Sequence, residues 1–222
     1  MFIHMQPPTP PRPGYALFDG RPVMAFRQES SRRTFIKGAA LVGVGGAFVA
    51  WRAGDPRAFA QGSATDLEIL NYALTLEYLE AEFYTQGLAG NVLTGRDLEL
   101  VTPIRDHEQA HVTALTETVT SLGGTPAEMP KFMFPDGTFT DRDMFLTAAS
   151  MFEELGVTAY HGQVPLIQSA EILGAAASIA GVESRHAAVV ADLLGGDPFP
   201  APFEANKPMD EVLAAAGQFI QS

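Results

Sequence analysis

Two short stretches decide the fold: Glu108-Gln109-Ala110-His111 and Glu183-Ser184-Arg185-His186, which share the pattern Glu-x-x-His. A spacing of three residues places the glutamate and the histidine on the same face of an α-helix. Each stretch lies in the middle of a segment whose apolar residues recur every three or four positions, as in a helix that packs in a bundle. The sequence therefore predicts two helices that each present a glutamate and a histidine to a buried face.

The same apolar period occurs in two further segments, and a glutamate interrupts each of them at mid-length. Glu77 interrupts the first segment and Glu153 interrupts the second. Glu77 precedes Glu108 by 31 residues and Glu153 precedes Glu183 by 30 residues, so the chain contains an approximate internal repeat of two helical hairpins.

A capping box at Thr65-Asp66-Leu67-Glu68, together with Gly and Pro signals at the other boundaries, delimits four long helices and one short helix. The predicted ranges are 65–86, 96–122, 141–161 and 169–194, with a short amphipathic helix at 209–220 on the outside. Pro103 predicts a kink or a break in the second helix. The first and third connections are short, but residues 123–140 are numerous enough to run the length of a bundle. This pattern predicts an all-α, ferritin-like four-helix bundle, with an ordinary bundle and one long loop as the alternative.

Four glutamates that face one another in a bundle core would repel strongly and would be costly to bury. Two divalent cations would neutralise the carboxylates and accept their oxygens as ligands. The chain has no cysteine, so carboxylate and imidazole groups must bind any metal. This ligand set suits iron and manganese alike. The sequence predicts a site for two metal ions with the ligands Glu77, Glu108, His111, Glu153, Glu183 and His186.

Other polar residues near these positions are expected to have structural roles. Glu80 lies about 60° from the buried face on a helical wheel and is expected at a partly exposed rim, with a role as a further ligand as the alternative. His107 is expected to pack, with orientation of a ligand as the alternative, and Glu154 is expected to be solvated. Tyr84 and Tyr160 each follow a glutamate by seven residues. They are expected to fill the core, with hydrogen bonding to the ligands as the alternative.

The N-terminal residues resemble a targeting segment. Ser31-Arg32-Arg33-Thr34-Phe35-Ile36-Lys37 precedes a short apolar stretch at 38–51, and Ala58-Phe59-Ala60 supplies small residues for cleavage. This pattern predicts a twin-arginine export signal within residues 1–60, a mature domain at residues 61–222, and a periplasmic or extracellular location. An uncleaved membrane anchor or an early translation start is the alternative.

With these motifs the chain resembles the ferritin-like superfamily, and specifically the desiccation-related ferritin-like family. The resemblance covers about residues 64–220. It is carried by residues 153–162, Glu-Glu-Leu-Gly-Val-Thr-Ala-Tyr-His-Gly, and by residues 179–186, Ile-Ala-Gly-Val-Glu-Ser-Arg-His. The Glu and Glu-x-x-His elements are shared with bacterial manganese catalases, rubrerythrins and ferritins. The resemblance therefore implies a dinuclear site but does not select its reaction.

The net charge of −12 argues against nucleic acid as a partner. No run approaches the length of a membrane span, so no membrane association is expected after signal cleavage. We expect a di-iron or di-manganese oxidoreductase, catalase-like or peroxidase-like, whose partner is a small oxidant, peroxide or dioxygen. The alternatives are an iron-storage protein and a non-enzymatic, desiccation-protective structural protein. Whether the chain is an enzyme and whether it forms a homo-oligomer stay open at this point.

Overall fold

The structure, a computed structural model, describes residues 56–221, with side chains from residue 66 onward. This part of the chain contains five α-helices: α2 (Pro56–Ala89), α3 (Gly95–Ser121), α4 (Arg142–Gln163), α5 (Ala170–Leu193) and α6 (Met209–Ala216), which continues into the 3₁₀ turn η1 (Gly217–Phe219). None of these helices is long and apolar enough to cross a bilayer. The predicted twin-arginine motif lies outside the described residues.

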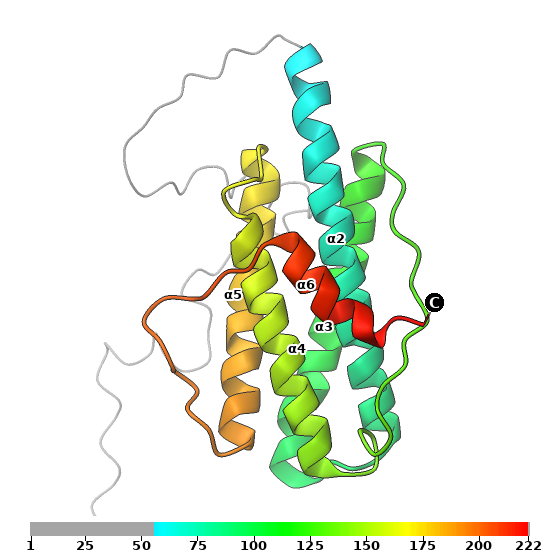
Figure 1. Cartoon of the computed structure of the whole chain (residues 1–222), viewed down its shortest axis with the longest axis vertical. Helices are drawn as coiled ribbons and strands as arrows, with labels where there is room; N and C mark the ends of the chain where they lie inside the picture. The colour runs from blue at the N-terminus through cyan, green and yellow to red at the C-terminus, as the bar shows by residue number, and fades with distance from the viewer. Residues whose placement is uncertain (1–55, 222) are drawn as a thin grey trace, which may run out of the picture. The chain divides into compact units, whose positions relative to one another are not determined.

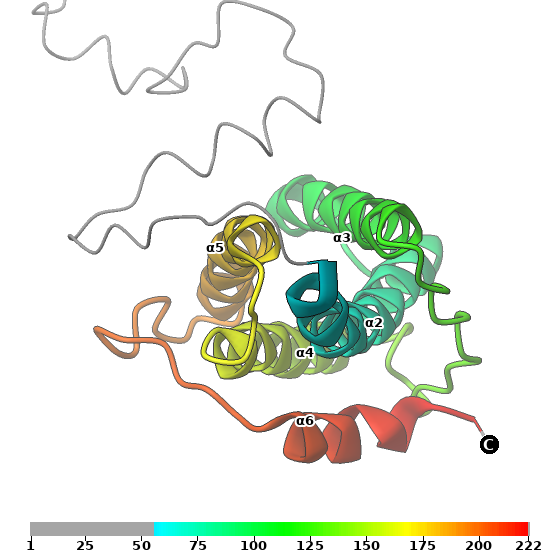
Figure 2. The same cartoon turned by 90° about the horizontal axis from the view of Figure 1, so that it is seen from above.

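Helices α2 to α5 form a four-helix bundle, and α6 lies on its outer surface against α2 and α4 (Figures 1 and 2). Helices α2 and α3 form one antiparallel hairpin and α4 and α5 form another. Residues 122–141 connect the two hairpins and run along the outside of the bundle from one end to the other (Figure 1). This long crossover confirms the predicted ferritin-like fold class.

The crossover is attached at two places, near its start and near its middle. The Asn71 carboxamide on α2 donates to the Thr125 carbonyl at 3.1 Å and accepts from the Ala127 N–H at 2.7 Å. Farther along, Phe132 forms an isolated antiparallel bridge with Ile220 after η1. These contacts hold a connection without helical structure against the bundle.

Side-chain caps begin both helices of the second hairpin, as the sequence predicts. Asp141 accepts from the Met144 N–H at 2.9 Å at the start of α4, and Ser169 accepts from the Ile172 N–H at 3.3 Å at the start of α5. Each cap satisfies a backbone donor that has no partner inside the helix. Pro103 lies inside α3, which continues on both sides of it.

The predicted start of the first helix at Thr65 is wrong, because α2 begins nine residues earlier, at Pro56. Asp66, which lies between the predicted capping residues Thr65 and Glu68, accepts hydrogen bonds from the N–H groups of Gln168 and Ser169, both at 2.9 Å. Its carboxylate therefore ties α2 to the connection between α4 and α5. The predicted mature start near residue 61 lies within the first turns of α2.

Apolar side chains fill the bundle in two clusters. In one of them, the Phe83 ring packs against Phe145, Phe152 and Phe134, with centroid separations of 4.8, 4.9 and 5.5 Å. The second cluster lies on the other side of the mid-helix glutamates and includes Leu74, Leu115, Tyr160 and Ile172. The polar centre of the bundle is thus enclosed along its length by apolar layers.

Candidate metal centre

The bundle brings all six predicted ligand residues together at mid-length. The four glutamates are 0% exposed, and both histidines are buried. The residues form two overlapping groups in which every ligand atom lies within 4.8 Å of the others. Glu108 and Glu183 belong to both groups, so the centre has two adjacent positions with two carboxylates in common. The groups are Glu77, Glu108, His111 and Glu183, and Glu108, Glu153, Glu183 and His186.

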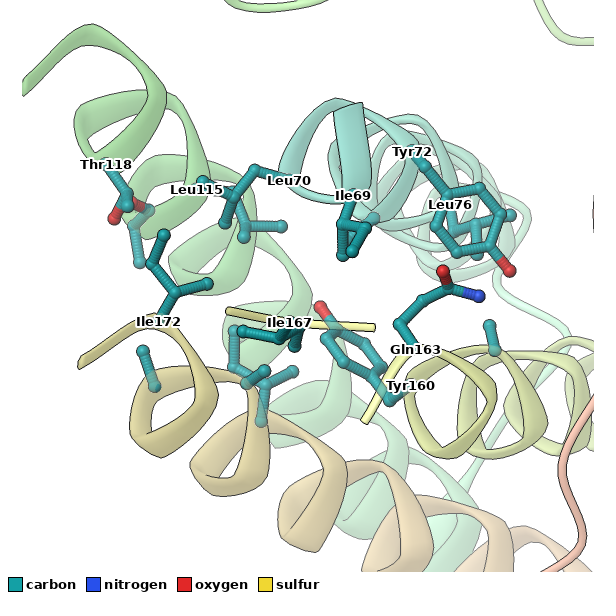
Figure 3. Close-up of a pocket in the computed structure, with 16 residues that line it drawn as sticks. Ile69, Leu70, Tyr72, Leu76, Leu115, Thr118, Tyr160, Gln163, Ile167 and Ile172 are labelled. Carbon is teal, nitrogen blue, oxygen red and sulfur yellow. The ribbon is translucent and has the colours of Figure 1, made fainter. Parts of the chain in front are cut away.

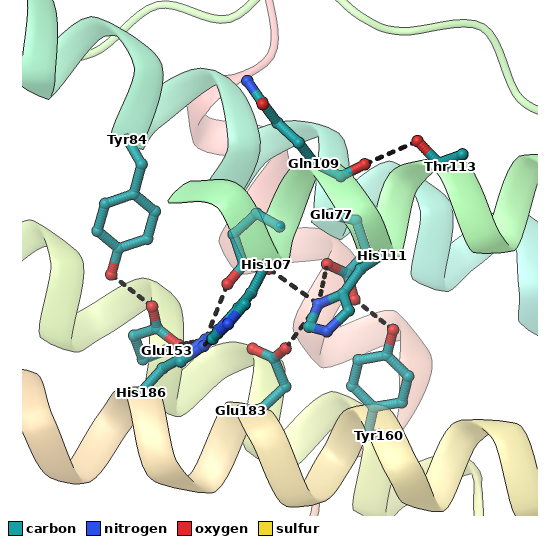
Figure 4. Close-up of polar contacts among 11 residues, drawn as sticks. Glu77, Tyr84, His107, Gln109, His111, Thr113, Glu153, Tyr160, Glu183 and His186 are labelled. Carbon is teal, nitrogen blue, oxygen red and sulfur yellow. Dashed lines mark hydrogen bonds and ion pairs between the residues drawn. The ribbon is translucent and has the colours of Figure 1, made fainter. Parts of the chain in front are cut away.

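The two Glu-x-x-His motifs face each other across the bundle (Figure 4). His111 Nδ1 lies 3.1 Å from Glu183 Oε1, and His186 Nδ1 lies 2.8 Å from Glu108 Oε1. This reciprocity follows from the antiparallel course of α3 and α5, because each motif places its histidine three residues beyond its glutamate. The centre therefore has an approximate twofold arrangement.

The two tyrosines make a second reciprocal pair. The Tyr84 hydroxyl on α2 donates to Glu153 Oε1 on α4, and the Tyr160 hydroxyl on α4 donates to Glu77 Oε1 on α2 (Figure 4). Each tyrosine follows the glutamate of its own helix by seven residues, and the helices are antiparallel, so each tyrosine meets the glutamate of the other helix. Both tyrosines are buried in the apolar clusters, as expected, and the alternative of hydrogen bonding to ligand carboxylates is also correct.

Several buried atoms of the centre lie at ion-pair distance from one another, such as His186 Nδ1 and Glu108 Oε1, but make no hydrogen bond within the described part of the chain. They are Glu108 Oε1, Glu153 Oε2, both carboxylate oxygens of Glu183, and His186 Nδ1. Buried polar atoms without partners are rare because each costs the desolvation free energy of the group. These oxygen and nitrogen atoms have lone pairs that metal ions at the centre would coordinate.

The spacing of the donors also fits shared cations. His111 Nδ1 faces three carboxylate oxygens, Glu77 Oε2 at 3.1 Å, Glu108 Oε2 at 3.2 Å and Glu183 Oε1 at 3.1 Å. A single N–H can point at only one of them. Two ligand atoms about 2.1 Å from one ion and at right angles lie about 3 Å apart. Separations of about 3 Å suit an N–H···O hydrogen bond and also two ligands of one ion, so the donor spacing is compatible with a common ion.

Without metal, the centre retains protons. Burial, together with the charge of Glu108, raises the pKa of Glu77 to about 7. Burial and the neighbouring carboxylates raise the pKa of Glu183 well above its usual range. Burial also opposes ionisation of Glu108, but the proximity of His111 and His186 outweighs it and lowers the Glu108 pKa to about 2. Metal binding must therefore displace protons.

Glu80 also lies at the centre, so its expected position at a partly exposed rim is wrong. Its side chain is 3% exposed, and burial and the charges of Glu183 and Glu108 raise its pKa well above the usual range. A Cβ atom on Gly156 would stand 3.0 Å from Glu80 Oε1 and 3.2 Å from Glu183 Oε2. The absence of a side chain on Gly156 therefore leaves room for both carboxylates.

The sequence contained a signal for the position of Glu80. Leu76, Glu80 and Phe83 recur at the helical spacing of four and three residues, which forms a second buried stripe on α2. Helix α2 contacts α3, α4 and α6, so its buried face is wider than one stripe.

His107 supports a predicted ligand rather than packing alone. Its Nδ1 lies 2.9 Å from Nε2 of His186, and the two rings are stacked with centroids 5.2 Å apart. This contact occupies one ring nitrogen of His186 and leaves Nδ1 directed at Glu108. Glu154 is exposed, as expected. His161 Nδ1 bonds the Val157 carbonyl at 2.8 Å, which gives it a structural role.

The fold and the buried carboxylate–histidine cluster together define a ferritin-like protein with a candidate dinuclear metal site. Residues 65–196 match the family model described as "Ferritin-like domain". The chain therefore belongs to the ferritin-like domain family.

The comparison with solved structures finds a crystal structure of ferritin-like, diiron-carboxylate proteins from Bacillus anthracis str. Ames. It shares 22% sequence identity with this chain, with a TM-score of 0.49, and the match covers 60% of this chain and 97% of that one. The comparison with curated proteins finds no match.

Proposed function

We propose that this chain is an exported dinuclear carboxylate protein that binds two iron or manganese ions and acts as an oxidoreductase on peroxide or dioxygen in stress protection. The observation that carries the proposal is that Glu108 and Glu183 belong to both ligand groups. Two ions held by shared carboxylates lie close enough to act on the same small molecule. When bound, such a metal pair supplies two-electron redox chemistry.

The protein's own residues divide into those that hold the ions and those that orient the ligands. Glu77 and His111 would complete one position, and Glu153 and His186 the other. The Tyr160 and Tyr84 hydroxyls each hold one oxygen of Glu77 and Glu153, respectively, and leave the other oxygen for an ion. His107 holds the His186 ring in the same manner. This support fixes the ligands before any metal arrives.

Glu80 adds a fifth buried carboxylate beside the six proposed ligands. Two divalent ions carry four positive charges, whereas the five carboxylates carry five negative charges when all are ionised. The centre therefore has one carboxylate more than the ions neutralise. Glu80 can remove this excess negative charge by staying protonated beside the centre. Alternatively, it can ionise and ligate an ion when the charge of the metal pair increases.

The test measures metal content and turnover together. The purified chain is loaded with iron(II) or manganese(II), freed of excess metal, analysed for bound metal, and assayed for consumption of hydrogen peroxide and of dioxygen. We expect two ions per chain and turnover that depends on them. A chain that binds neither metal after loading would refute the proposal. Two bound ions without turnover would indicate a structural metal, and hundreds of irons per oligomer would indicate storage.

A further inference from the structure

A cavity in the bundle lies apart from the ligand atoms of the metal centre. It has a volume of about 60 Å³ and lies between α2, α3, α4 and α5, near the connection from α4 to α5 (Figure 3). Apolar side chains make up most of its wall, and none of the residues that line it is charged. Typical members of the wall are Ile69, Leu76, Leu115, Ile167 and Ile172.

Among the polar side chains that line this cavity, two are buried and have no hydrogen-bond partner in the part of the chain that the structure describes. Gln163 on α4 is 3% exposed and Tyr72 on α2 is 6% exposed. Within the described residues, the Gln163 carboxamide oxygen and nitrogen and the Tyr72 hydroxyl make no hydrogen bond. In Figure 3 the Gln163 carboxamide points toward Tyr72. Buried amide and hydroxyl groups are almost always satisfied, so a bound group is expected between them.

The two side chains define the chemistry of that group. Gln163 offers one donor nitrogen and one acceptor oxygen, and the Tyr72 hydroxyl offers both functions. A complementary head group therefore both donates and accepts a hydrogen bond, as a hydroxyl or a primary amide does. A charged head group would lose its hydration and find no counter-charge in the wall.

The volume limits the size of the ligand. A water molecule needs about 10–15 Å³ of such space, so the cavity has room for about four to six non-hydrogen atoms. We propose that this cavity binds a small neutral organic molecule, with its hydroxyl or amide head on Tyr72 and Gln163 and its short apolar tail among the isoleucines and leucines.

Tyr160 connects this site to the metal centre. Its ring lines the cavity, and its hydroxyl donates to Glu77. A molecule in the cavity thus lies one side chain away from a proposed ligand. The cavity site goes beyond the proposed redox function and does not depend on metal.

The test uses 1-butanol, which has five non-hydrogen atoms, as the probe, and follows binding to the full chain by methyl NMR with and without metal. We expect saturable binding with a dissociation constant in the millimolar range and no binding of butyrate, an anion with the same length of carbon chain. Tyr72→Phe and Gln163→Leu should each weaken 1-butanol binding about tenfold, which is about 1.4 kcal/mol. The matched control Tyr78→Phe, at a position outside the cavity wall, should leave binding unchanged.

Three outcomes would overturn the proposal. The first is that the Tyr72 and Gln163 variants bind 1-butanol as tightly as the unaltered chain does. The second is that butyrate binds as tightly as 1-butanol. The third is a crystal structure in which a water molecule bridges the two side chains and is not displaced by 1-butanol. Because Tyr72→Phe removes only one oxygen, a folding defect in the Gln163 variant would still leave the idea testable. Loss of metal binding with intact 1-butanol binding would refute only the redox function.

Discussion

Removal of metal should reverse the way in which the stability of this protein depends on pH. In the metal-free chain, burial raises the pKa of Glu77 from 4.5 to about 7. The unfolded chain loses this proton near the ordinary pKa, whereas the folded chain keeps it until the higher value is reached. The resulting stabilisation is complete below the unfolded pKa and is lost as the pH rises through about 7.

The size of this effect follows from the change in pKa. Raising the pKa from 4.5 to about 7 corresponds to about 3 kcal/mol, at about 1.36 kcal/mol for each tenfold change in proton affinity. Burial opposes the charged forms of His111 and His186, but the nearby carboxylates raise their pKa values to about 12 and about 10. Their stabilisation is also lost with rising pH. Glu108 has the opposite sign, but it acts only below its unfolded pKa of 4.5.

The measurement is urea unfolding followed by circular dichroism, at about pH 5 and about pH 8, with and without metal. In chelator, the free energy of unfolding should fall by at least about 3 kcal/mol between these pH values. With metal it should rise, because the ligands must lose their protons to bind the ions. The isosteric variant Glu77→Gln should remove about 3 kcal/mol of the metal-free pH dependence.

A metal-free chain that is equally stable at both pH values, or more stable at the higher one, would refute this reasoning. Such a result would mean that the carboxylates of the centre are hydrated or already paired without metal. A pH dependence that Glu77→Gln leaves unaltered would instead place the retained protons on other groups.

Three further predictions concern single positions. Glu108→Ala should abolish the binding of both metal ions, because this carboxylate belongs to both ligand groups. The control variant Glu154→Ala, at the surface, should bind the full amount of metal. Equal losses of metal in the two variants would contradict the assignment of ligands. Tyr160→Phe should lower the free energy of unfolding by about 1–3 kcal/mol in urea, since a buried carboxylate loses its hydroxyl donor, and an unchanged value would show that the hydrogen bond contributes nothing. Replacement of Arg32 and Arg33 by lysine should block export in a cell-fractionation assay, and normal export would exclude a twin-arginine route.

Much of the fold could be predicted from local sequence patterns. Asp141 and Ser169 mark the starts of α4 and α5 because their side chains bond the helix within three residues, so the signal lies in adjacent sequence. The long crossover was predicted from the absence of a helical period between two periodic segments. The joint position of the six proposed ligands follows from the repeat, since equal spacing in two antiparallel hairpins brings their midpoints together.

The remaining features depend on how one helix lies against another, and a single helical period does not contain that information. The Tyr84 and Tyr160 hydrogen bonds depend on the relative positions of α2 and α4 along the bundle. Glu80 is buried because α2 is covered by three other helices. The early start of α2 was missed because the pattern from Thr65 to Glu68 resembles a capping box, although it lies inside the helix.

Neither hairpin alone contains a complete metal position. The first group takes three residues from α2 and α3 and Glu183 from α5, and the second takes three residues from α4 and α5 and Glu108 from α3. Slippage of one hairpin by a single turn, about 5.4 Å, would separate the shared carboxylates from their partners. We therefore expect tight metal affinity only after both hairpins have docked in the correct alignment. Misassembled chains would bind the ions weakly, so metal would stabilise the correctly assembled bundle relative to them.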